Sequence, residues 1–154
     1  MNRRIFLKGS VAGGTVALAA GAGLITPGQL LAAWPKSAFE AKSVGDALNS
    51  AAGSSAFGES SSVIVKAPDI AENGAVVPIN VKVEGGNVES ISILVEGNNT
   101  PLVANFNLAA NTQADVSTRI KMGKTSNVMA VAKVDGKLVS AKKEVKVTIG
   151  GCGG

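Results

Sequence analysis

The residue of this chain with the most evident chemistry is its single cysteine, Cys152. A structural cysteine is normally a small buried hydrophobe. This one lies between two glycine pairs, Gly150-Gly151 and Gly153-Gly154, which offer no side chains to pack against and leave the backbone almost unrestricted. A glycine-rich linker of about five residues has a root-mean-square reach of roughly 12 Å and spans about 17 Å when extended. We therefore interpret residues 150–154 as a flexible arm that presents a reactive thiol to other proteins. The alternative is a frayed tail in which the cysteine has no role.

The residue types that are absent restrict the chemistry further. The chain has no histidine, which excludes Ser-His and Cys-His nucleophile activation within it and every histidine-containing metal site. One thiol cannot form a zinc site alone, and no acidic cluster resembles a calcium loop. Aromatic side chains, on which single-stranded nucleic acids stack, are almost missing. We expect no catalytic residue, no metal and no cofactor, so that any reaction at Cys152 is carried out by other enzymes.

The first residues predict an export signal. Arg3 and Arg4 precede Ile5-Phe6-Leu7-Lys8 and an uncharged run, rich in glycine and alanine, from Gly9 to Pro35. Paired arginines before a moderately apolar segment resemble a twin-arginine signal peptide, here residues 1–33. The alternative is a transmembrane anchor, because the run is long enough to span a bilayer. Its glycines make it poorly hydrophobic, so we predict cleavage, a periplasmic location and no stable membrane insertion.

Export changes what the charge and the cysteine imply. Without Arg3, Arg4 and Lys8, 12 basic side chains face 11 acidic ones, so a nucleic-acid partner is not indicated. Oxidising compartments favour disulfides. A lone cysteine in an exported protein therefore indicates an intermolecular bond or a free reactive thiol.

The rest of the chain must position this arm. Residues 34–61 are predicted as one short helix within Ser37 to Asn49, where Ser43 is a possible cap, and a linker. Residues 62–149 consist of short apolar runs separated by turn residues, which is typical of strands. Seven or eight strands without intervening helices predict an all-β, immunoglobulin-like β-sandwich. The expected strands are residues 63–65, 76–83, 88–95, 102–108, 116–122, 128–134, 137–140 and 145–149.

Two local features refine the sandwich. Asp135-Gly136 predicts a two-residue hairpin, and Pro78 suits the start or the edge of a strand. Lys142, Lys143 and Lys146 crowd the last predicted strand. They either create a positive field that attracts anions and favours the thiolate, or protect an edge strand from aggregation. We favour the second interpretation.

The twin-arginine leader, the small all-β domain and the ending Gly150-Gly151-Cys152-Gly153-Gly154 together resemble SoxY, the sulfur-carrier subunit of the periplasmic thiosulfate-oxidising Sox system. The pentapeptide matches that family's carrier arm residue for residue. The resemblance implies that Cys152 carries sulfur as an S-thiosulfonate and a persulfide. It also implies the partners: a SoxZ-like β-sandwich subunit in a heterodimer, a c-type haem enzyme that conjugates thiosulfate, a metal-dependent sulfate-releasing hydrolase, and a sulfur dehydrogenase or a storage route.

Two other functions compete with this one. A ubiquitin-like sulfur carrier also ends in Gly-Gly, but it needs activation by ATP in the cytoplasm and packs a substantial helix on a small sheet. The export leader and the strand-only body oppose it. The second competitor is an exported structural β-sandwich module that is joined to a partner through an interchain disulfide at Cys152.

Overall fold

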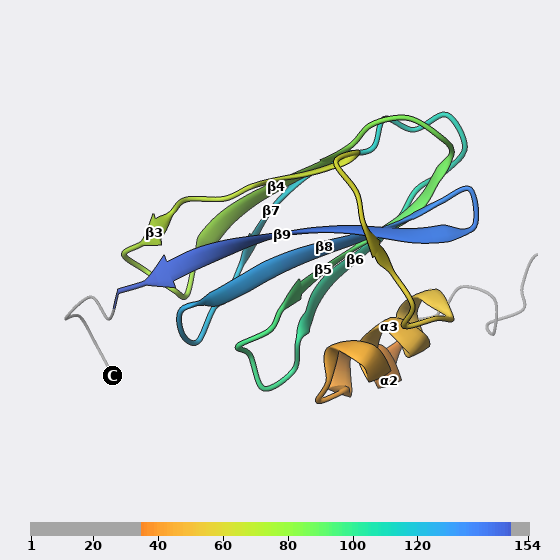
Figure 1. The fold of residues 1–154 in the computed structure, drawn as a ribbon. Helices are drawn as coiled ribbons and strands as arrows, with labels where there is room; N and C mark the ends of the chain where they lie inside the picture. Colours follow the sequence, from red (N-terminus) through yellow and green to blue (C-terminus); the bar gives the residue numbers. More distant parts are fainter. Residues whose placement is uncertain (1–34, 149–154) are drawn as a thin grey trace, which may run out of the picture. The chain divides into compact units, whose positions relative to one another are not determined.

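The computed structural model describes residues 35–148 (Figure 1). The predicted signal peptide with Arg3 and Arg4, and the predicted arm with Cys152, lie outside the described residues. The described part contains two helices and nine strands: α2 (Lys36–Glu40), α3 (Val44–Ala52), β1 (Gly58–Glu59), β2 (Val63–Lys66), β3 (Ile70–Ala71), β4 (Val77–Val83), β5 (Val88–Val95), β6 (Leu102–Asn107), β7 (Asp115–Ile120), β8 (Ser126–Val134) and β9 (Lys137–Val147).

The strands form two sheets. The small sheet has the order β2-β4-β7, and the large sheet has the order β1-β9-β8-β5-β6, with β3 also paired to β9. The chain alternates between these sheets, as in immunoglobulin-like sandwiches. The predicted all-β sandwich with short helical structure before it is confirmed.

The core lies between the facing sides of the two sheets. Val77, Ile79, Val81 and Val83 of β4 are buried while the residues between them are more exposed, which is the period of a strand with one face in the core. Side chains of β5 and β8 meet them from the large sheet. The alternation predicted for β4 is therefore confirmed.

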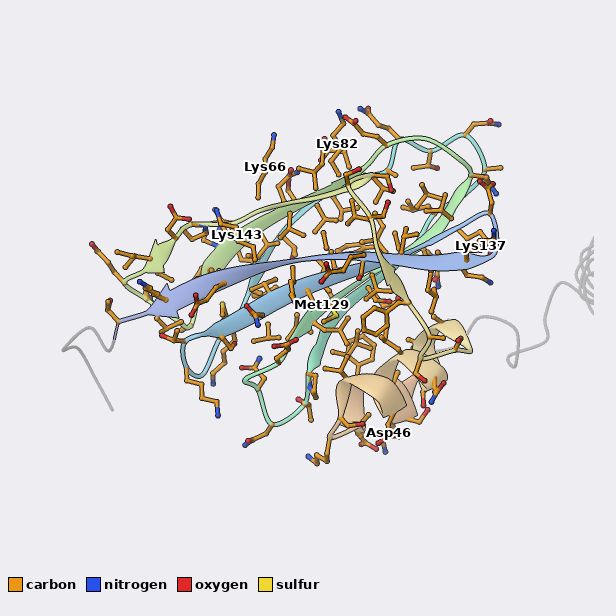
Figure 2. All side chains as sticks on the ribbon, in the orientation of Figure 1. Asp46, Lys66, Lys82, Met129, Lys137 and Lys143 are labelled. Carbon is orange, nitrogen blue, oxygen red and sulfur yellow. The ribbon has the colours of Figure 1, made fainter. Side chains whose placement is uncertain are left out.

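The other face of the large sheet is covered by the helices. Ala38, Ala47 and Leu48 pack with Leu94 of β5 and Met129 of β8 in a second apolar cluster, and Figure 2 labels Met129. This cluster binds the segment that precedes the sandwich to its outer surface.

The short helical structure predicted within Ser37 to Asn49 is present, but it is divided into two helices because the chain leaves the helical conformation between α2 and α3. Ala41 and Ser43 are extended, with ψ angles of 143° and 153°. Ser43 is the N-cap as predicted, and its Oγ accepts a hydrogen bond of 3.1 Å from the Asp46 N–H. The cap therefore starts a second helix instead of strengthening a single one.

The strands differ from the predictions mainly around β9. The sequence predicts two strands, over residues 137–140 and 145–149, but β9 is continuous over 11 residues. The predicted hairpin before it is confirmed: Asp135 and Gly136 have φ angles of 49° and 76°, and both being positive is characteristic of a type I′ turn. The short strands β1 and β3 were missed, because two residues carry no periodicity.

Pro78 lies where the strand has one neighbour. The pairing of β2 with β4 ends at Lys66↔Asn80, and continuing that register would place Pro68 opposite Pro78. Neither proline has an N–H to donate. The ladder therefore stops there, and the chain leaves the small sheet and crosses to β9. The prediction that Pro78 lies near a strand start is confirmed, as it is the second residue of β4.

Candidate functional site at the root of the C-terminal arm

The structure describes the base from which the predicted arm extends, and Thr148 is the last described residue. Cys152, Gly150, Gly151, Gly153 and Gly154 lie beyond it. We call residues 146–148 the arm root. The fold can therefore show how firmly the start of the arm is held and what surrounds it.

The arm root consists of the last two residues of β9 and the residue after them. On its inner side, β9 is paired with β8. The two strands are paired from Val134↔Lys137 to Ser126↔Val145. The side chain of Val145 is fully buried in the core between the sheets. Burying a valine stabilises by about 1.5 kcal/mol or more. The strand is thus anchored to within three residues of Thr148.

Two segments then clamp the arm root itself. On one side, β3 runs parallel to β9 with Ala71 beside Val147, and the Thr148 N–H donates to the Ala71 carbonyl at 3.1 Å. On the other side, the Val147 N–H donates to the hydroxyl oxygen of Thr125 at 2.9 Å. Figure 1 shows β3 beside the end of β9 that leads to the C-terminal residues. The backbone is therefore fixed on both sides up to Thr148.

Gly74 allows the clamp to close. A Cβ at this position would lie 2.5 Å from the Met122 carbonyl oxygen and 2.7 Å from Cγ1 of Val147, both shorter than real Cβ contacts. The Met122 N–H also donates to the Gly74 carbonyl at 2.7 Å. The turn before β4 and the turn after β7 can therefore approach each other and the arm root only because residue 74 lacks a side chain.

Two of the three lysines on β9 hold neighbouring segments in place. Lys142 forms an ion pair of 3.5 Å with Glu59 of β1. Lys143 pairs with Asp69 at 3.0 Å and donates to the Ala67 carbonyl at 2.7 Å, and Figure 2 labels it. Lys146 has no ion pair within residues 35–148. The observations favour the interpretation that these lysines protect and cover a strand edge over the interpretation of a positive field.

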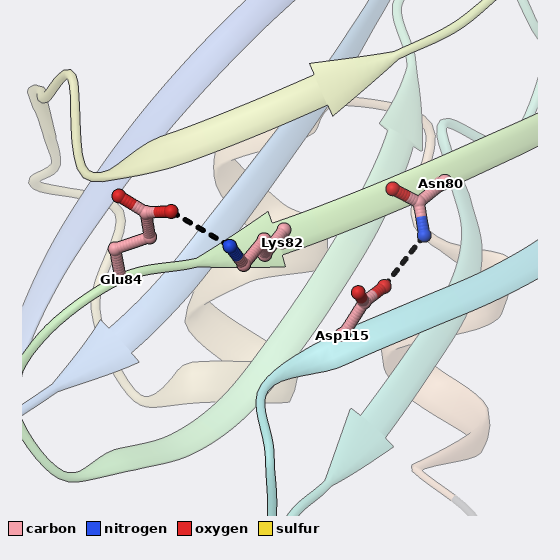
Figure 3. Close-up of polar contacts among 4 residues, drawn as sticks. All are labelled: Asn80, Lys82, Glu84 and Asp115. Carbon is pink, nitrogen blue, oxygen red and sulfur yellow. Dashed lines mark hydrogen bonds and ion pairs between the residues drawn. The ribbon is translucent and has the colours of Figure 1, made fainter.

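Other charged contacts lie away from the arm root. On the outer face of the small sheet, Lys82 and Glu84 form an ion pair of 2.7 Å (Figure 3). The hydrogen bond to Glu84 raises the pKa of Lys82, and the same bond lowers the pKa of Glu84. At the hairpin end of β9, the hydrogen bond from Lys133 lowers the pKa of Glu89. These groups stabilise the sheets and do not form a reactive centre.

Within residues 35–148, no group of three His, Cys, Asp or Glu side chains could hold a metal ion. Neither α2 nor α3 has the length and hydrophobicity of a membrane-spanning helix. A hollow of about 850 Å³ opens on the small sheet beside Pro68 and Pro78. The hollow is lined, among others, by the cationic Lys66 and Arg119 and by the hydroxyl groups of Ser117 and Thr118, and no nucleophilic side chain in its lining lies beside a general base.

Sequence reasoning missed the residues of the clamp. Thr125 and Ala71 lie 22 and 77 positions from their partners on the arm root, so no local pattern connects them. The Asn73-Gly74 pair did offer a turn signal. It gave no indication that the turn packs against the last strand.

Comparisons with known proteins agree on a family. The sequence model of the sulfur oxidation protein SoxY family matches residues 48–152, a stretch that ends at Cys152. The solved structure of the sulfur carrier protein SoxY from Chlorobium limicola f thiosulfatophilum is 40% identical, with a TM-score of 0.63 over 75% of this chain and 100% of the other. The superoxide reductase (neelaredoxin) from Ignicoccus hospitalis is 18% identical, with a TM-score of 0.51 over 56% of this chain and 80% of the other, and shows a common fold alone. No curated protein sequence matches this chain significantly.

Proposed function

The chain belongs to the SoxY family of sulfur carrier proteins, and from this membership we propose that it carries the intermediates of thiosulfate oxidation covalently on Cys152. The residues Gly150, Gly151, Gly153 and Gly154 form the carrier arm. The chain itself catalyses no step, and partner enzymes react with the sulfur that it presents. We further propose that it works in the periplasm after export by the twin-arginine route, for which Arg3 and Arg4 are the signal.

The observation that carries this proposal is the short distance along the chain between the clamped backbone and Cys152. The backbone is held by hydrogen bonds up to Thr148, and the cysteine follows four residues later, after a glycine pair. A glycine-rich segment of about five residues reaches roughly 12–17 Å. The sulfur can therefore enter a channel of another protein while the sandwich stays outside, and the firm root limits which surface faces that protein.

The proposed cycle begins with oxidative capture. The Cys152 thiolate and thiosulfate join in an S–S bond to give Cys152–S–S–SO₃⁻, and two electrons pass to a c-type haem enzyme. A metal-dependent hydrolase then adds water to the terminal sulfur and releases sulfate and two protons, which leaves a Cys152 persulfide anion. A sulfur dehydrogenase or a storage route deals with the remaining sulfane sulfur. Persulfides and disulfides are accessible states of an exposed thiol.

Covalent capture explains how a chain without histidine can serve an oxidation pathway. The carrier must retain a small anion between enzymes, which a covalent bond does without a binding pocket. The acid, base and metal chemistry then belongs to the partners. A SoxZ-like β-sandwich subunit, forming a heterodimer with this chain, is part of the proposal.

Mass spectrometry of the intact protein from cells oxidising thiosulfate tests the proposal. We expect added masses of a thiosulfonate and of single sulfur atoms on Cys152. The Cys152→Ser variant should lack these masses and unfold at the same temperature as the wild type. The Gly154→Ala variant keeps the thiol and should still be loaded.

Two outcomes would contradict the carrier function. One is a Cys152 that never acquires sulfur in such cells. The other is a permanent disulfide-linked species in non-reducing electrophoresis that thiosulfate does not change, which would support the structural module instead.

A further inference from the structure

The outer edge of β7 is the strand edge that the fold leaves most open. β7 is the last strand of the small sheet, with no neighbour beyond it among the described residues. The Val83 N–H donates to the Ala114 carbonyl at 2.8 Å, and bonded pairs alternate with non-bonded pairs in an antiparallel ladder. The register between β4 and β7 is regular throughout. The residues whose backbone groups point away from β4 are therefore Asp115, Ser117 and Arg119.

Most of these outward backbone groups have no partner within residues 35–148. The Asp115 N–H bonds to the Gln113 carbonyl at 2.9 Å. The Asp115 carbonyl and both backbone groups of Ser117 and Arg119 take part in no hydrogen bond of the described residues. Such a row of donors and acceptors is a template for pairing with another strand.

The other edges of the two sheets carry devices that oppose such pairing. The outer edge of β9 is covered in part by β1 and β3. The pairing of β6 with β5 has an irregular register between Ile93 and Leu94, and bulges twist an edge away from a partner. β2 has only four residues and is followed closely by Pro68. In contrast, β7 is six residues long and regular.

The charged side chains along this edge would be complementary to the same edge of a second copy of the chain. Asp115 and Arg119 lie two residues before and after Ser117, on the exposed face of the small sheet. Oδ1 of Asp115 accepts a bond of 2.6 Å from the Asn80 amide (Figure 3), and its Oδ2 makes no hydrogen bond or ion pair with the described residues. Arg119 has no ion pair within the same part of the chain. An antiparallel copy centred on Ser117 would place each Asp115 directly opposite an Arg119 of the other copy.

We propose that a second copy of this chain adds to β7 in antiparallel orientation about Ser117, so that the small sheets of the two copies form one continuous sheet. Each Ser117 exchanges its backbone hydrogen bonds with Ser117 of the other copy. Each Arg119 N–H donates to an Asp115 carbonyl, and the side chains of these residues form cross-strand ion pairs. Parallel pairing would place like charges together, so the charges also select the orientation.

This interface is small, and we expect reversible association that weakens with salt. It does not depend on the chemistry of Cys152. Sedimentation velocity of the purified chain, with Cys152 alkylated to exclude disulfide-linked dimers, tests it at about 10 µM to about 1 mM, the range expected for small interfaces. We expect a dimer that forms with increasing concentration and whose Ser117 and Arg119 amides are protected from hydrogen exchange.

A charge swap separates this pairing from other contacts. Arg119→Asp places an acid opposite Asp115 at both symmetry-related positions of the dimer. Because two favourable charge pairs are replaced by two repulsive ones, dimerisation should weaken by about thirtyfold. Asp115→Arg should do the same. The double variant Asp115→Arg/Arg119→Asp restores opposite charges and should recover association to within about threefold. Ser117→Pro removes an outward N–H and should abolish the dimer while the protein stays folded by circular dichroism.

Several results would overturn the proposal. They are a monomer at every concentration, a dimer that the single charge reversals leave unchanged, and a double variant that fails to recover although it is folded. A chain that stays monomeric alone, but whose Ser117 amide becomes protected when a separate β-sandwich subunit is added, would assign this edge to that subunit and refute self-pairing. None of these results bears on whether Cys152 carries sulfur.

Discussion

The outer edges of β9 and β7 start from the same problem, because a strand edge without a full-length neighbour exposes backbone donors and acceptors. At β9 the chain covers part of its own edge: β1 pairs with Val139 and Ser140, and β3 pairs with Lys146 and Val147. At β7 no such segment is present among the described residues. The covered edge belongs to the strand that precedes the proposed carrier arm, whereas the open edge has no such segment after it: β7 turns back into β8.

The difference teaches what each edge is suited to do. The proposed carrier arm needs a firm base, and the short parallel strand β3 together with the Thr125 hydroxyl holds the arm root. An edge with free backbone groups and complementary charges is suited to pairing with another strand. Four predictions test this comparison, from the largest expected effect to the smallest.

Gly74→Ala should cause the largest loss of stability, because it disturbs the packing around the arm root at the covered edge of β9. The added Cβ would collide with the Met122 carbonyl and the Val147 side chain, and overpacking of this kind typically costs about 1–3 kcal/mol. Urea unfolding should show that loss, and hydrogen exchange should show faster opening at Thr148. Gly58→Ala is the matched control, because a Cβ there meets nothing within 4 Å. Equal stability of the two variants would refute the close packing at residue 74.

Thr125→Val should loosen the arm root without changing its shape. The substitution removes the acceptor of the 2.9 Å hydrogen bond from the Val147 N–H. We expect a loss of about 1 kcal/mol or less, since the site is exposed. Hydrogen exchange at the Val147 amide is the direct measurement. Unchanged protection there would mean that β3 alone holds the root.

Lys143→Met should detach the connection between β2 and β3 from β9. It removes the 3.0 Å ion pair with Asp69 and the 2.7 Å bond to the Ala67 carbonyl. The loss should be about 0.5–1 kcal/mol, because the pair is partly exposed. Lys146→Met serves as the control, since Lys146 has no ion pair in the described part. If both variants lose the same stability, the contact of Lys143 is not structural.

Acid should have the smallest effect and act on both sheets. The pKa values of Glu84 and Glu89 are lowered from 4.5, by hydrogen bonds from Lys82 and Lys133 respectively. A lowered carboxyl pKa stabilises the fold above the unfolded value, and this contribution is lost as the pH falls through the folded pKa. Melting temperatures should therefore decrease below about pH 4.5. Glu89→Gln should make the melting temperature fall less steeply at low pH. A pH profile like that of the wild type would contradict the contribution assigned to Glu89.

The sequence predicted the sandwich because its signals are local and repeated. Ile79, Val81 and Val83 alternate with polar residues, and Asp135-Gly136 demands a tight hairpin. The helical region was predicted less well, since Ser43 fits the interior of one helix and the start of a second equally well by its spacing. β9 was divided into two predicted strands because charged residues 142–144 interrupt its apolar pattern. Pairing with β8 overrides that interruption.

The sequence by itself determined which reactive groups the chain can offer: a single cysteine between glycines, no histidine, and a strand-forming body before them. These features can be read from the residue types and their order along the chain alone. Only the tertiary structure decided how the arm root is clamped and which edge stays open. Those outcomes depend on contacts such as Ala71 with Thr148, 77 positions apart, and on the register of whole strands, which exist only once the chain has folded.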